Sequence, residues 1–354
     1  MNQSIINVGL IGFGLGGRIF HAPILTAVPG FQLHTVYETR EENVKTIHRC
    51  YPGAKVVSDV NEIFESKDIQ LIVVATPNNV HFSYAKKAME NGKHVLVEKP
   101  FTCTSSEAEE LIEISKKTNK VLTVNHNRRW DSDFKTVQKV IKSEMLGEIV
   151  EYEAHYDRYR PEVGENWRDK KSSAASGMLY DLGSHLIDQV QYLFGLPNEI
   201  FAYIDTQRKN SEVVDAFEIL LKYDTLKVTL KSGMIVREPA PHFALHGRKG
   251  SFVKYGMDVQ EDELILGKRP NEGKEWGREP EAIYGKINTE IGGVHVSGTV
   301  ESEAGDYREL YRNLYQVITN EEELIVTPQQ ACNTIKIIEL AEQSNREKRW
   351  VKYE

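Results

Sequence analysis

A glycine-rich turn directly after the first apolar run is the feature that most restricts the fold of this 354-residue chain. The run covers residues 5–11, which is long enough for a buried parallel strand and too short for a helix. Gly12, Gly14 and Gly17 then fit G-x-G-x-x-G at the start of a helical pattern. In that pattern the first glycine permits a tight turn, the second lets a pyrophosphate approach the backbone, and the third lets helix and strand pack closely. The turn predicts a dinucleotide site whose phosphates lie on the helix N-terminus, although such a turn can also merely connect two elements.

The first 124 residues alternate between short apolar runs and helical patterns. Runs typical of buried strands lie at 31–37, 71–75, 94–97 and 121–124. Thr104 and Glu107 predict a capping box at the start of a helix that ends near Thr118. This alternation indicates a doubly wound parallel sheet with right-handed crossovers, whose ligands lie at the carboxyl ends of the strands.

The end of the second predicted strand should decide between NAD and NADP. Glu38 lies about twenty residues beyond the glycines, where an acid commonly binds the ribose 2′-hydroxyl of NAD. Thr39 and Arg40 follow it and could hold the 2′-phosphate of NADP through a charge-assisted hydrogen bond. The two signals conflict, and Glu38 and Arg40 could also be solvated loop charges.

Polar residues follow three of the predicted strands directly. The segments are Thr76-Pro77-Asn78-Asn79, Glu98-Lys99-Pro100 and Asn125-His126-Asn127-Arg128-Arg129. Three such loops at one sheet edge predict a site, because ligands of open α/β sheets bind there. The alternative is structural, since polar residues follow buried strands in any α/β fold.

After about residue 130 the pattern changes to strands that alternate apolar and polar residues. They are expected at 148–156, 199–206, 217–223, 226–231 and 242–245. We therefore expect a dinucleotide-binding domain over residues 1–124 and an α+β domain over 125–354, with a large open, mainly antiparallel sheet. A helix at 330–345 is expected to pack between the domains, with a subunit interface as the alternative.

A helical pattern over residues 178–194 carries a polar stripe of Asp181, Ser184, His185 and Asp188. Asp181 and His185 are four residues apart, so the carboxylate could orient the imidazole for proton transfer from an alcohol. The alternative, which periodicity alone favours, is the solvated face of an amphipathic helix. No zinc-binding spacing of His or Cys supports a metal site.

Composition excludes several classes of protein. A formal charge of −8 argues against a general nucleic-acid binder, and no apolar run is long enough to cross a bilayer. With three cysteines and no signal-peptide pattern, we expect a reduced, cytoplasmic protein. Five arginines could create a local positive field, or they could simply form a solvated face of the protein. They are Arg128, Arg129, Arg158, Arg160 and Arg168.

Taken together, these motifs resemble the glucose-fructose oxidoreductase and inositol dehydrogenase (Gfo/Idh/MocA) family over nearly the whole chain. The motifs are the glycine turn, Ala75-Thr76-Pro77-Asn78, Glu98-Lys99-Pro100 and the segment from Gly177 to Asp188 that contains D-x-x-x-H. Further segments are similar to its NADP-dependent scyllo-inositol 2-dehydrogenase branch: Phe20-His21-Ala22-Pro23, His126 to Asp131, Arg158-Tyr159-Arg160-Pro161 and Lys254-Tyr255-Gly256.

The resemblance implies a Rossmann domain, a second domain whose open sheet mediates subunit contacts, and catalysis by Lys99, Asp181 and His185. Oxidation of a secondary alcohol needs a base for the hydroxyl proton, a cation for the developing alkoxide and a hydride acceptor. His185 is expected as base or proton relay, Lys99 as the cation and acid-base partner, and Asp181 as the orienting group. The sequence leaves open whether Lys99 or His185 takes the proton first.

The resemblance also favours NADP through Thr39-Arg40, while Glu38 keeps NAD open. The expected cofactor-binding residues are Gly12, Phe13, Gly14, Leu15, Gly17, Glu38, Thr39, Arg40, Thr76, Pro77, Asn78, His81, Glu98, Lys99 and Asn127. The expected substrate-binding residues are Lys99, His126, Tyr159, Arg160, Trp167, Asp181 and His185.

The residues predict hydride transfer between a nicotinamide cofactor and a secondary alcohol of a cyclic polyol or sugar, and the resemblance implies scyllo-inositol and its ketone as the leading pair. Aldose oxidation, glycoside hydrolysis with bound NAD and a non-catalytic dinucleotide sensor are the alternatives. A homodimer or homotetramer formed through the C-terminal sheet is expected, without a metal, a nucleic-acid partner or a membrane.

Overall fold

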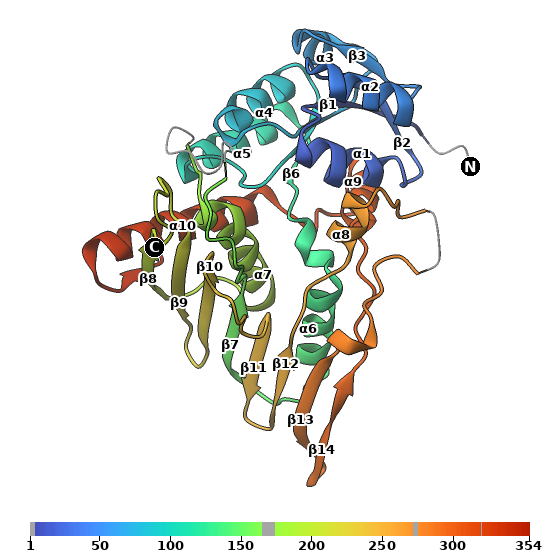
Figure 1. Ribbon diagram of the computed structural model, residues 1–354. Coiled ribbons are helices and arrows are strands. Elements are labelled where there is room, and N and C mark those ends of the chain that lie inside the picture. The colour runs from blue at the N-terminus through green and yellow to red at the C-terminus, as the bar shows by residue number, and fades with distance from the viewer. Residues whose placement is uncertain (1–3, 165–173, 272–274, 320) are drawn as a thin grey trace. The chain divides into compact units, whose positions relative to one another are not determined.

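The computed structural model describes residues 4–164, 174–271, 275–319 and 321–354 and divides into two compact units (Figure 1). The first unit comprises Met1–Asn127, Gln260–Trp276 and Asp306–Cys332. The second unit comprises Arg128–Val259, Gly277–Gly305 and Asn333–Glu354. Two segments from the second half of the chain therefore belong to the first unit. None of the helices in the described ranges is both long and apolar enough to cross a membrane.

The first unit contains a six-stranded parallel sheet in the order β3-β2-β1-β4-β5-β6. Its strands are β1 (Ile6–Ile11), β2 (Phe31–Tyr37), β3 (Lys55–Val57), β4 (Leu71–Val74), β5 (His94–Val97) and β6 (Leu122–Val124). Every residue of β4 is buried, as expected for a parallel strand covered on both faces. The strand order reverses between β1 and β4, and ligands of such sheets bind at the carboxyl ends beside that reversal. The parallel, doubly wound sheet predicted from the sequence is confirmed.

The helices of the first unit come from between these strands and from the two later segments of the chain. They are the π-type turn η1 (Gly16–His21), α1 (Ala22–Leu25), α2 (Glu41–Cys50), α3 (Asn61–Glu65), the 3-10 turn η2 (Asn78–Val80), α4 (His81–Glu90), α5 (Ser105–Thr118), α8 (Gln260–Ile265) and α9 (Arg308–Ile318). The predicted capping box of α5 is present: Thr104 Oγ1 accepts a hydrogen bond from the Glu107 N–H, and the Glu107 carboxylate accepts one from the Thr104 N–H.

Helix α9 packs beside α1 and β2 in the first unit (Figure 1). Gly30 has φ of +94°, and a Cβ there would lie 2.2 Å from the Tyr315 ring, so the helix approaches the backbone closely. The Phe31 ring packs edge-on against Tyr311 and Tyr315. These aromatic contacts anchor α9 to the parallel sheet.

The second unit contains a nine-stranded sheet in the order β14-β13-β12-β11-β7-β10-β9-β8-β15. Its strands are β7 (Ile149–His155), β8 (Glu199–Asp205), β9 (Ala216–Lys222), β10 (Lys227–Gly233), β11 (Phe243–Gly247), β12 (Gly250–Lys254), β13 (Gly285–Ile291), β14 (Val294–Val300) and β15 (Val351–Lys352). Only the β7–β10 pair is parallel, so the mainly antiparallel sheet predicted from the sequence is confirmed. The sequence interpretation missed β12 to β15.

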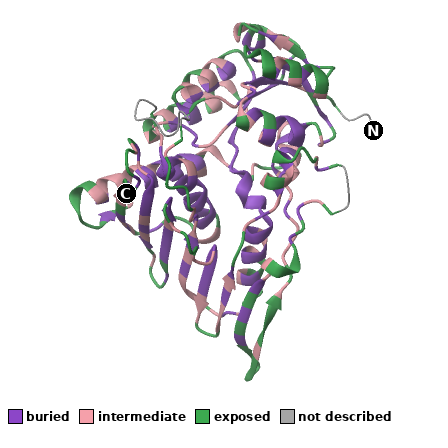
Figure 2. Ribbon diagram, in the orientation of Figure 1, coloured by how far each residue is buried: buried purple, intermediate pink, exposed green. Residues whose placement is uncertain are grey.

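The helices of the second unit share one apolar core with one face of this sheet. They are α6 (Ser132–Lys142), the π-type turn η5 (Leu179–Gly183), α7 (Ser184–Phe194) and α10 (Pro328–Glu347). Burial alternates along the strands, which appear as purple and pink or green bands in Figure 2. Residues that point away from the helices form exposed ion pairs between strands, such as Lys227 with Glu151 and Lys222 with Glu199. From α10, Ile337, Ile338 and Ala341 belong to this core.

Candidate dinucleotide and active site

The three glycines of the turn after β1 meet the steric demands that the motif predicts. Gly12 has φ of +97°, and a Cβ there would lie 2.4 Å from the carbonyl oxygen of Ala75. A Cβ at Gly17 would lie 2.0 Å from the carbonyl oxygen of Gly12, so the helix packs directly on the turn. At Gly14 the nearest atom to such a Cβ is Arg40 Nη2 at 3.7 Å, which leaves space beside the backbone. The turn therefore fits a pyrophosphate.

The two other residues expected in this turn are placed differently. Phe13 is buried, its ring packs edge-on against Tyr51, and its carbonyl oxygen accepts a hydrogen bond from Asn43 Nδ2. Leu15 is 47% exposed. Phe13 can thus contact a dinucleotide only through its backbone, whereas the side chain of Leu15 is accessible.

At the end of β2 the Glu38 carboxylate is turned into the protein. Its Oε1 accepts hydrogen bonds from the backbone N–H groups of Thr39 and Arg40, both at 2.9 Å, and from Arg40 Nε at 3.1 Å. Its Oε2 accepts from Arg40 Nη2 at 2.8 Å and from Asn43 Nδ2 at 2.6 Å. Burial alone would raise the pKa of Glu38, but these hydrogen bonds lower it to about 2. Glu38 is 6% exposed, so the interpretation of it as a solvated loop charge is wrong.

Arg40 remains accessible although it pairs with Glu38. Its side chain is 57% exposed, and Nη2 lies beside the open space at Gly14. Thr39 is exposed next to it. The Thr39 hydroxyl and the Arg40 guanidinium are therefore accessible to a ligand, whereas the Glu38 carboxylate is buried.

The polar segments after β4, β5 and β6 meet at the carboxyl edge of the sheet, as the sequence predicts. The first residue of each of two segments donates a backbone hydrogen bond to the last residue of the neighbouring strand: Glu98 N to Val74 O at 2.9 Å, and Asn125 N to Val97 O at 2.8 Å. Asn125 Nδ2 also donates to Glu98 Oε1 at 2.8 Å. The two segments are thus held together by side chains as well as by the sheet.

Glu98 is the centre of a hydrogen-bond network in the first unit. Its Oε1 contacts His21 Nε2 at 2.8 Å, and its Oε2 accepts from the backbone N–H of Lys99 at 2.9 Å. Burial raises the pKa of Glu98, but the contact with His21, the charge of Lys99 and the hydrogen bond from Asn125 together lower it to about 2. Glu98 is therefore ionised at neutral pH, and Lys99, which is partly exposed, follows it at a cis Lys99–Pro100 peptide bond.

His81 and Thr76 lie where two of these segments approach each other. The ring nitrogens of His81 contact the carbonyl oxygens of Pro100 at 2.9 Å and Thr76 at 3.0 Å, so this buried imidazole ties the two segments together. Burial is the main cause that lowers its pKa. Within the described residues, Thr76 Oγ1 is buried and makes no hydrogen bond. Such an orphaned hydroxyl beside Gly12 fits a polar ligand at this edge.

The remaining cofactor and substrate positions of the first unit differ in exposure. Pro77 is exposed, whereas Asn78 and Asn127 are buried. His126 is 1% exposed. These residues lie in or directly after the polar segments, at the carboxyl ends of β4 and β6.

In the second unit, Asp181 lies in η5 and His185 lies in the first turn of α7. Three members of the polar stripe are buried, with His185 at 5%, Asp188 at 1% and Ser184 at 0% exposure. Asp188 accepts two hydrogen bonds from Arg129, at 2.6 and 2.8 Å. The interpretation of the stripe as a solvated helix face is therefore wrong, because these three residues are buried and Asp188 forms an ion pair with the buried Arg129.

The five arginines predicted to form a solvated face or a positive field differ in their surroundings. Arg128 and Arg129 are buried and paired with Asp131 and Asp188, so neither is part of a solvated face. Burial, followed by the charge of Arg160, lowers the pKa of Arg158. Arg160 is exposed. Trp167 and Arg168 lie outside the described residues.

Tyr159 is 45% exposed and makes an isolated bridge with Ile235. The Arg237 guanidinium stacks on its ring, with the central carbon 3.8 Å from the ring centroid. Tyr159 is thus a surface residue whose orientation is fixed by a cation–π contact.

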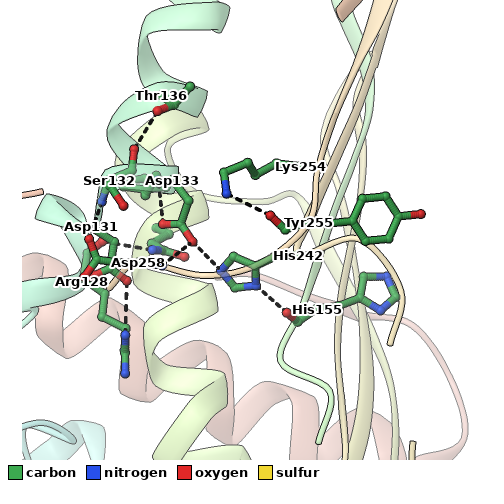
Figure 3. Close-up of polar contacts among 12 residues, drawn as sticks. Arg128, Asp131, Ser132, Asp133, Thr136, His155, His242, Lys254, Tyr255 and Asp258 are labelled. Atoms are coloured by element: carbon green, nitrogen blue, oxygen red, sulfur yellow. Dashed lines mark hydrogen bonds and ion pairs between the residues drawn. The ribbon is translucent and has the colours of Figure 1, made fainter. Parts of the chain in front are cut away.

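A separate buried cluster surrounds Lys254 in the second unit (Figure 3). Lys254 Nζ pairs with Glu279 at 2.9 Å, and Glu279 also accepts a hydrogen bond from Ser132 Oγ. Asp258 accepts from the backbone N–H of Ser132 at 2.7 Å. These contacts hold the start of α6, which gives the Lys254-Tyr255-Gly256 segment a structural role. In the described ranges no three His, Cys, Asp or Glu side chains are arranged to hold a metal ion.

Three residues that contact Glu98 or Glu38 were not predicted as site residues: His21 and Asn125, which contact Glu98, and Asn43, which contacts Glu38. His21 stands in the segment Phe20-His21-Ala22-Pro23, which was used only for the family resemblance. Asn125 begins a predicted polar segment, so its position after a strand was a usable signal. Asn43 carries no signal, since its contact with Glu38 depends on how α2 packs.

Comparisons with known proteins agree with this architecture. Residues 6–126 match the family model "Oxidoreductase family, NAD-binding Rossmann fold", and residues 138–353 match "Oxidoreductase family, C-terminal alpha/beta domain". The chain is 41% identical over 349 residues to the scyllo-inositol 2-dehydrogenase (NADP(+)) IolW of Bacillus subtilis (strain 168), covering 99% of this chain and 96% of that protein. It is 38% identical over 340 residues to the oxidoreductase YdgJ of Escherichia coli (strain K12), covering 96% of each.

A solved structure shares the fold over the full length. The oxidoreductase yvaA from Bacillus subtilis superposes with a TM-score of 0.95 at 39% identity, covering 100% of both chains. The two family models together span most of the chain, and residues 6–126 contain all six strands of the parallel sheet. The chain therefore belongs to the Gfo/Idh/MocA oxidoreductase family, and residues 6–126 form the NAD(P)-binding Rossmann fold of that family.

Proposed function

We propose that this oxidoreductase transfers hydride between NADP and a secondary alcohol of a cyclic polyol, with scyllo-inositol and its ketone as the leading pair. The relative at 41% identity is named for that substrate and that cofactor, and the similarity extends over 99% of the chain. The observation that carries the cofactor choice is the inward orientation of Glu38.

A carboxylate that selects NAD must offer an oxygen to the ribose 2′-hydroxyl. Both oxygens of Glu38 already accept hydrogen bonds, five in all. A ribose hydroxyl would have to displace one of these donors and leave it unpaired, which costs about 1–3 kcal/mol. The exposed guanidinium of Arg40 and the hydroxyl of Thr39 instead offer donors to a 2′-phosphate. This arrangement favours NADP.

When bound, the nicotinamide supplies the chemistry of hydride acceptance and donation. The residues proposed to hold the dinucleotide are the glycine turn, Arg40 and the segments after β4 and β5. Lys99 is proposed to stabilise the developing alkoxide as a cation. His185 is proposed to accept the hydroxyl proton, with Asp181 orienting it.

The proposed substrate is a ring with several hydroxyl groups, because the side chains assigned to it are hydrogen-bonding groups rather than an apolar lining. His126, Tyr159 and Arg160 are the proposed substrate contacts. Tyr159 and Arg160 are exposed and Tyr159 is held by Arg237, which suits a surface that receives a polar ligand.

The test is a panel of inositols, aldoses and their keto forms, assayed by absorbance of the reduced cofactor with NADP and with NAD. The wild-type chain should oxidise at least one inositol, with kcat/KM at least about tenfold higher for NADP. Arg40→Ser should lower kcat/KM for NADP about 10- to 150-fold, the equivalent of a charged hydrogen bond of about 1.5–3 kcal/mol. Its kcat/KM for NAD should change little.

Arg49→Ser is the matched control, because Arg49 is an exposed arginine in the last turn of α2. It should leave both efficiencies unchanged. Preference for NAD by the wild type, or an equal effect of Arg40→Ser on both cofactors, would contradict the cofactor choice. Absence of turnover on every polyol and aldose would contradict the reaction.

A further inference from the structure

We propose that His21 is a positioning residue for the Lys99 end of the active site, acting through Glu98 and supported by Tyr311. This inference rests on the proposed function, in which Lys99 acts on the substrate oxygen. His21, Tyr311 and Glu98 all belong to the first unit. None of the three was assigned a catalytic role by the sequence.

The contacts form one continuous chain. Tyr311 in α9 contacts His21 Nδ1 through its hydroxyl at 2.7 Å, and His21 Nε2 contacts Glu98 Oε1 at 2.8 Å. The other carboxylate oxygen of Glu98 accepts the backbone N–H of Lys99 at 2.9 Å. His21 is 0% and Tyr311 is 1% exposed, so water does not substitute for these contacts. A helix from the second half of the chain is thus connected to the backbone of Lys99.

The protons in this chain follow from the chemistry of the groups. The Glu98 carboxylate accepts from Asn125 and from the Lys99 N–H, so its ionised form is the one that the site is built to hold. His21 Nε2 must then carry the hydrogen that it donates to Glu98. The other ring nitrogen, Nδ1, pairs with the Tyr311 hydroxyl. Burial and the charge of Glu98 raise the pKa of Tyr311 well above its ordinary value, so the hydroxyl keeps its proton.

The carboxylate of Glu98 lies at the edge of the dinucleotide turn. A Cβ at Gly16 would lie 3.7 Å from Glu98 Oε1. Among the described residues, the titratable groups that face Glu98 are His21, Lys99, Tyr311 and His81. Without the donor at His21, the buried carboxylate would bind a proton more readily and hold the Lys99 backbone less firmly. His21 therefore maintains both the charge of Glu98 and the position of Lys99.

A pair of amide variants separates the two contacts of His21, because the amide nitrogen of glutamine reproduces Nε2 and that of asparagine reproduces Nδ1. His21→Gln keeps a donor for Glu98, and we expect kcat/KM within about threefold of the wild type. His21→Asn loses that donor, and we expect kcat/KM to fall about 10- to 100-fold, the range found when a hydrogen-bonded partner of a functional ligand is removed in metal enzymes. The loss should lie in kcat, with the Kd for NADPH, measured by fluorescence titration, unchanged within about threefold.

The pH profile of kcat/KM distinguishes positioning from a general structural role. The folded pKa of Glu98 lies below its ordinary value, so activity that needs its carboxylate is lost only as the pH falls through that pKa. In His21→Asn the pKa of Glu98 rises, and the acid limb of the profile should move up by about one pH unit or more, a tenfold change in proton affinity. His48→Gln, a substitution in the last turn of α2, is the control and should change neither the profile nor kcat/KM.

An NMR measurement tests the inference without turnover. In the full-length chain labelled with [15N]histidine, the His21 ring should show a hydrogen on Nε2, and Tyr311→Phe should shift the Nδ1 resonance. An Nε2 without a hydrogen, or an equal loss of activity in His21→Gln and His21→Asn, would overturn the inference. An inactive wild-type chain with the expected tautomer would instead refute only the proposed function.

Discussion

The glycines of the dinucleotide turn are required for different reasons, so alanine substitutions should separate binding from folding. A methyl group at Gly14 would have only Arg40 Nη2 nearby, at 3.7 Å, and should leave the free energy of unfolding within about 0.5 kcal/mol of the wild type. It should raise the Kd for NADPH at least about tenfold, because it occupies the phosphate approach. At Gly17 the methyl group would lie 2.0 Å from Gly12 O, so Gly17→Ala should lower the free energy of unfolding by about 1–3 kcal/mol or more.

Urea unfolding and a fluorescence titration with NADPH check both halves of this prediction. The two variants serve as controls for each other, because each adds one methyl group to the same turn, at positions only three residues apart. Unchanged NADPH affinity in Gly14→Ala, or wild-type stability in Gly17→Ala, would show that the steric roles are assigned wrongly.

The same scale shows which site residues could be predicted. The glycines follow a pattern with a steric reason at each position, and their geometry matches it. The orientation of Glu38 could not be predicted, because it depends on Asn43 reaching it from the packed helix α2. The burial of Asp188 also could not be predicted from the sequence. Helical periodicity indicates on which face of the helix a residue lies, but not that Arg129 packs against it.

At the scale of elements, prediction succeeded where hydrophobic pattern and local structure agree. Strand β4 of the parallel sheet is a continuous apolar run, and β2 and β5 have the bounds that were predicted. Strand β14 was missed; it is an edge strand whose residues are mostly exposed. The β13–β14 hairpin is fixed instead by the two positive-φ glycines at its turn, Gly292 and Gly293.

The start of helix α6 carries a pH-dependent prediction (Figure 3). Burial, and then the charges of Asp258 and Glu279, raise the pKa of Asp133 from 3.8 to about 7, while Lys254 opposes the shift. Burial lowers the pKa of His242 to about 3, so this imidazole is neutral. Because its Nδ1 contacts a carbonyl oxygen, that of His155, the lone pair of Nε2 faces Asp133 Oδ2 at 3.5 Å. A protonated Asp133 suits this arrangement, and an ionised one does not.

The sign of the effect follows from the raised pKa. The folded state keeps a proton on Asp133 that the unfolded chain releases above about pH 4, so stability from this group falls as the pH rises from about 4 to 7. Asp133→Asn resembles the protonated form, and urea unfolding should therefore show a smaller loss of stability between pH 5 and pH 8 than in the wild type. Asp68→Asn, at an exposed position, should follow the wild-type profile. Parallel profiles for Asp133→Asn and the wild type would contradict the assignment.

At the scale of the whole molecule, the dinucleotide-binding unit is not one continuous stretch of chain. Nothing in the periodicity of α9 indicates that it packs on the first sheet, because an amphipathic helix shows that a partner exists but not which one. In the structure, Tyr315 fills the space beside Gly30, and Tyr311 contacts His21. Thr123 in β6 donates a hydrogen bond to the carbonyl oxygen of Val326 at 2.7 Å. The family match at residues 6–126 therefore contains the parallel sheet but not helix α9, which packs on it.

A fragment of residues 1–127 should for this reason fold poorly although it contains all six strands of the sheet. It lacks two buried tyrosines that pack on Phe31, and the loss of one large buried aromatic residue alone costs about 3–5 kcal/mol, a large share of the stability of a small domain. Far-UV circular dichroism in urea should show no cooperative transition, and addition of a peptide of residues 306–332 should restore one. The same peptide with Tyr311→Ala and Tyr315→Ala should not, because it cannot fill the space at Gly30 or bind His21. A cooperative transition in the fragment alone, with a midpoint near that of the full chain, would show that α9 is dispensable for the Rossmann unit.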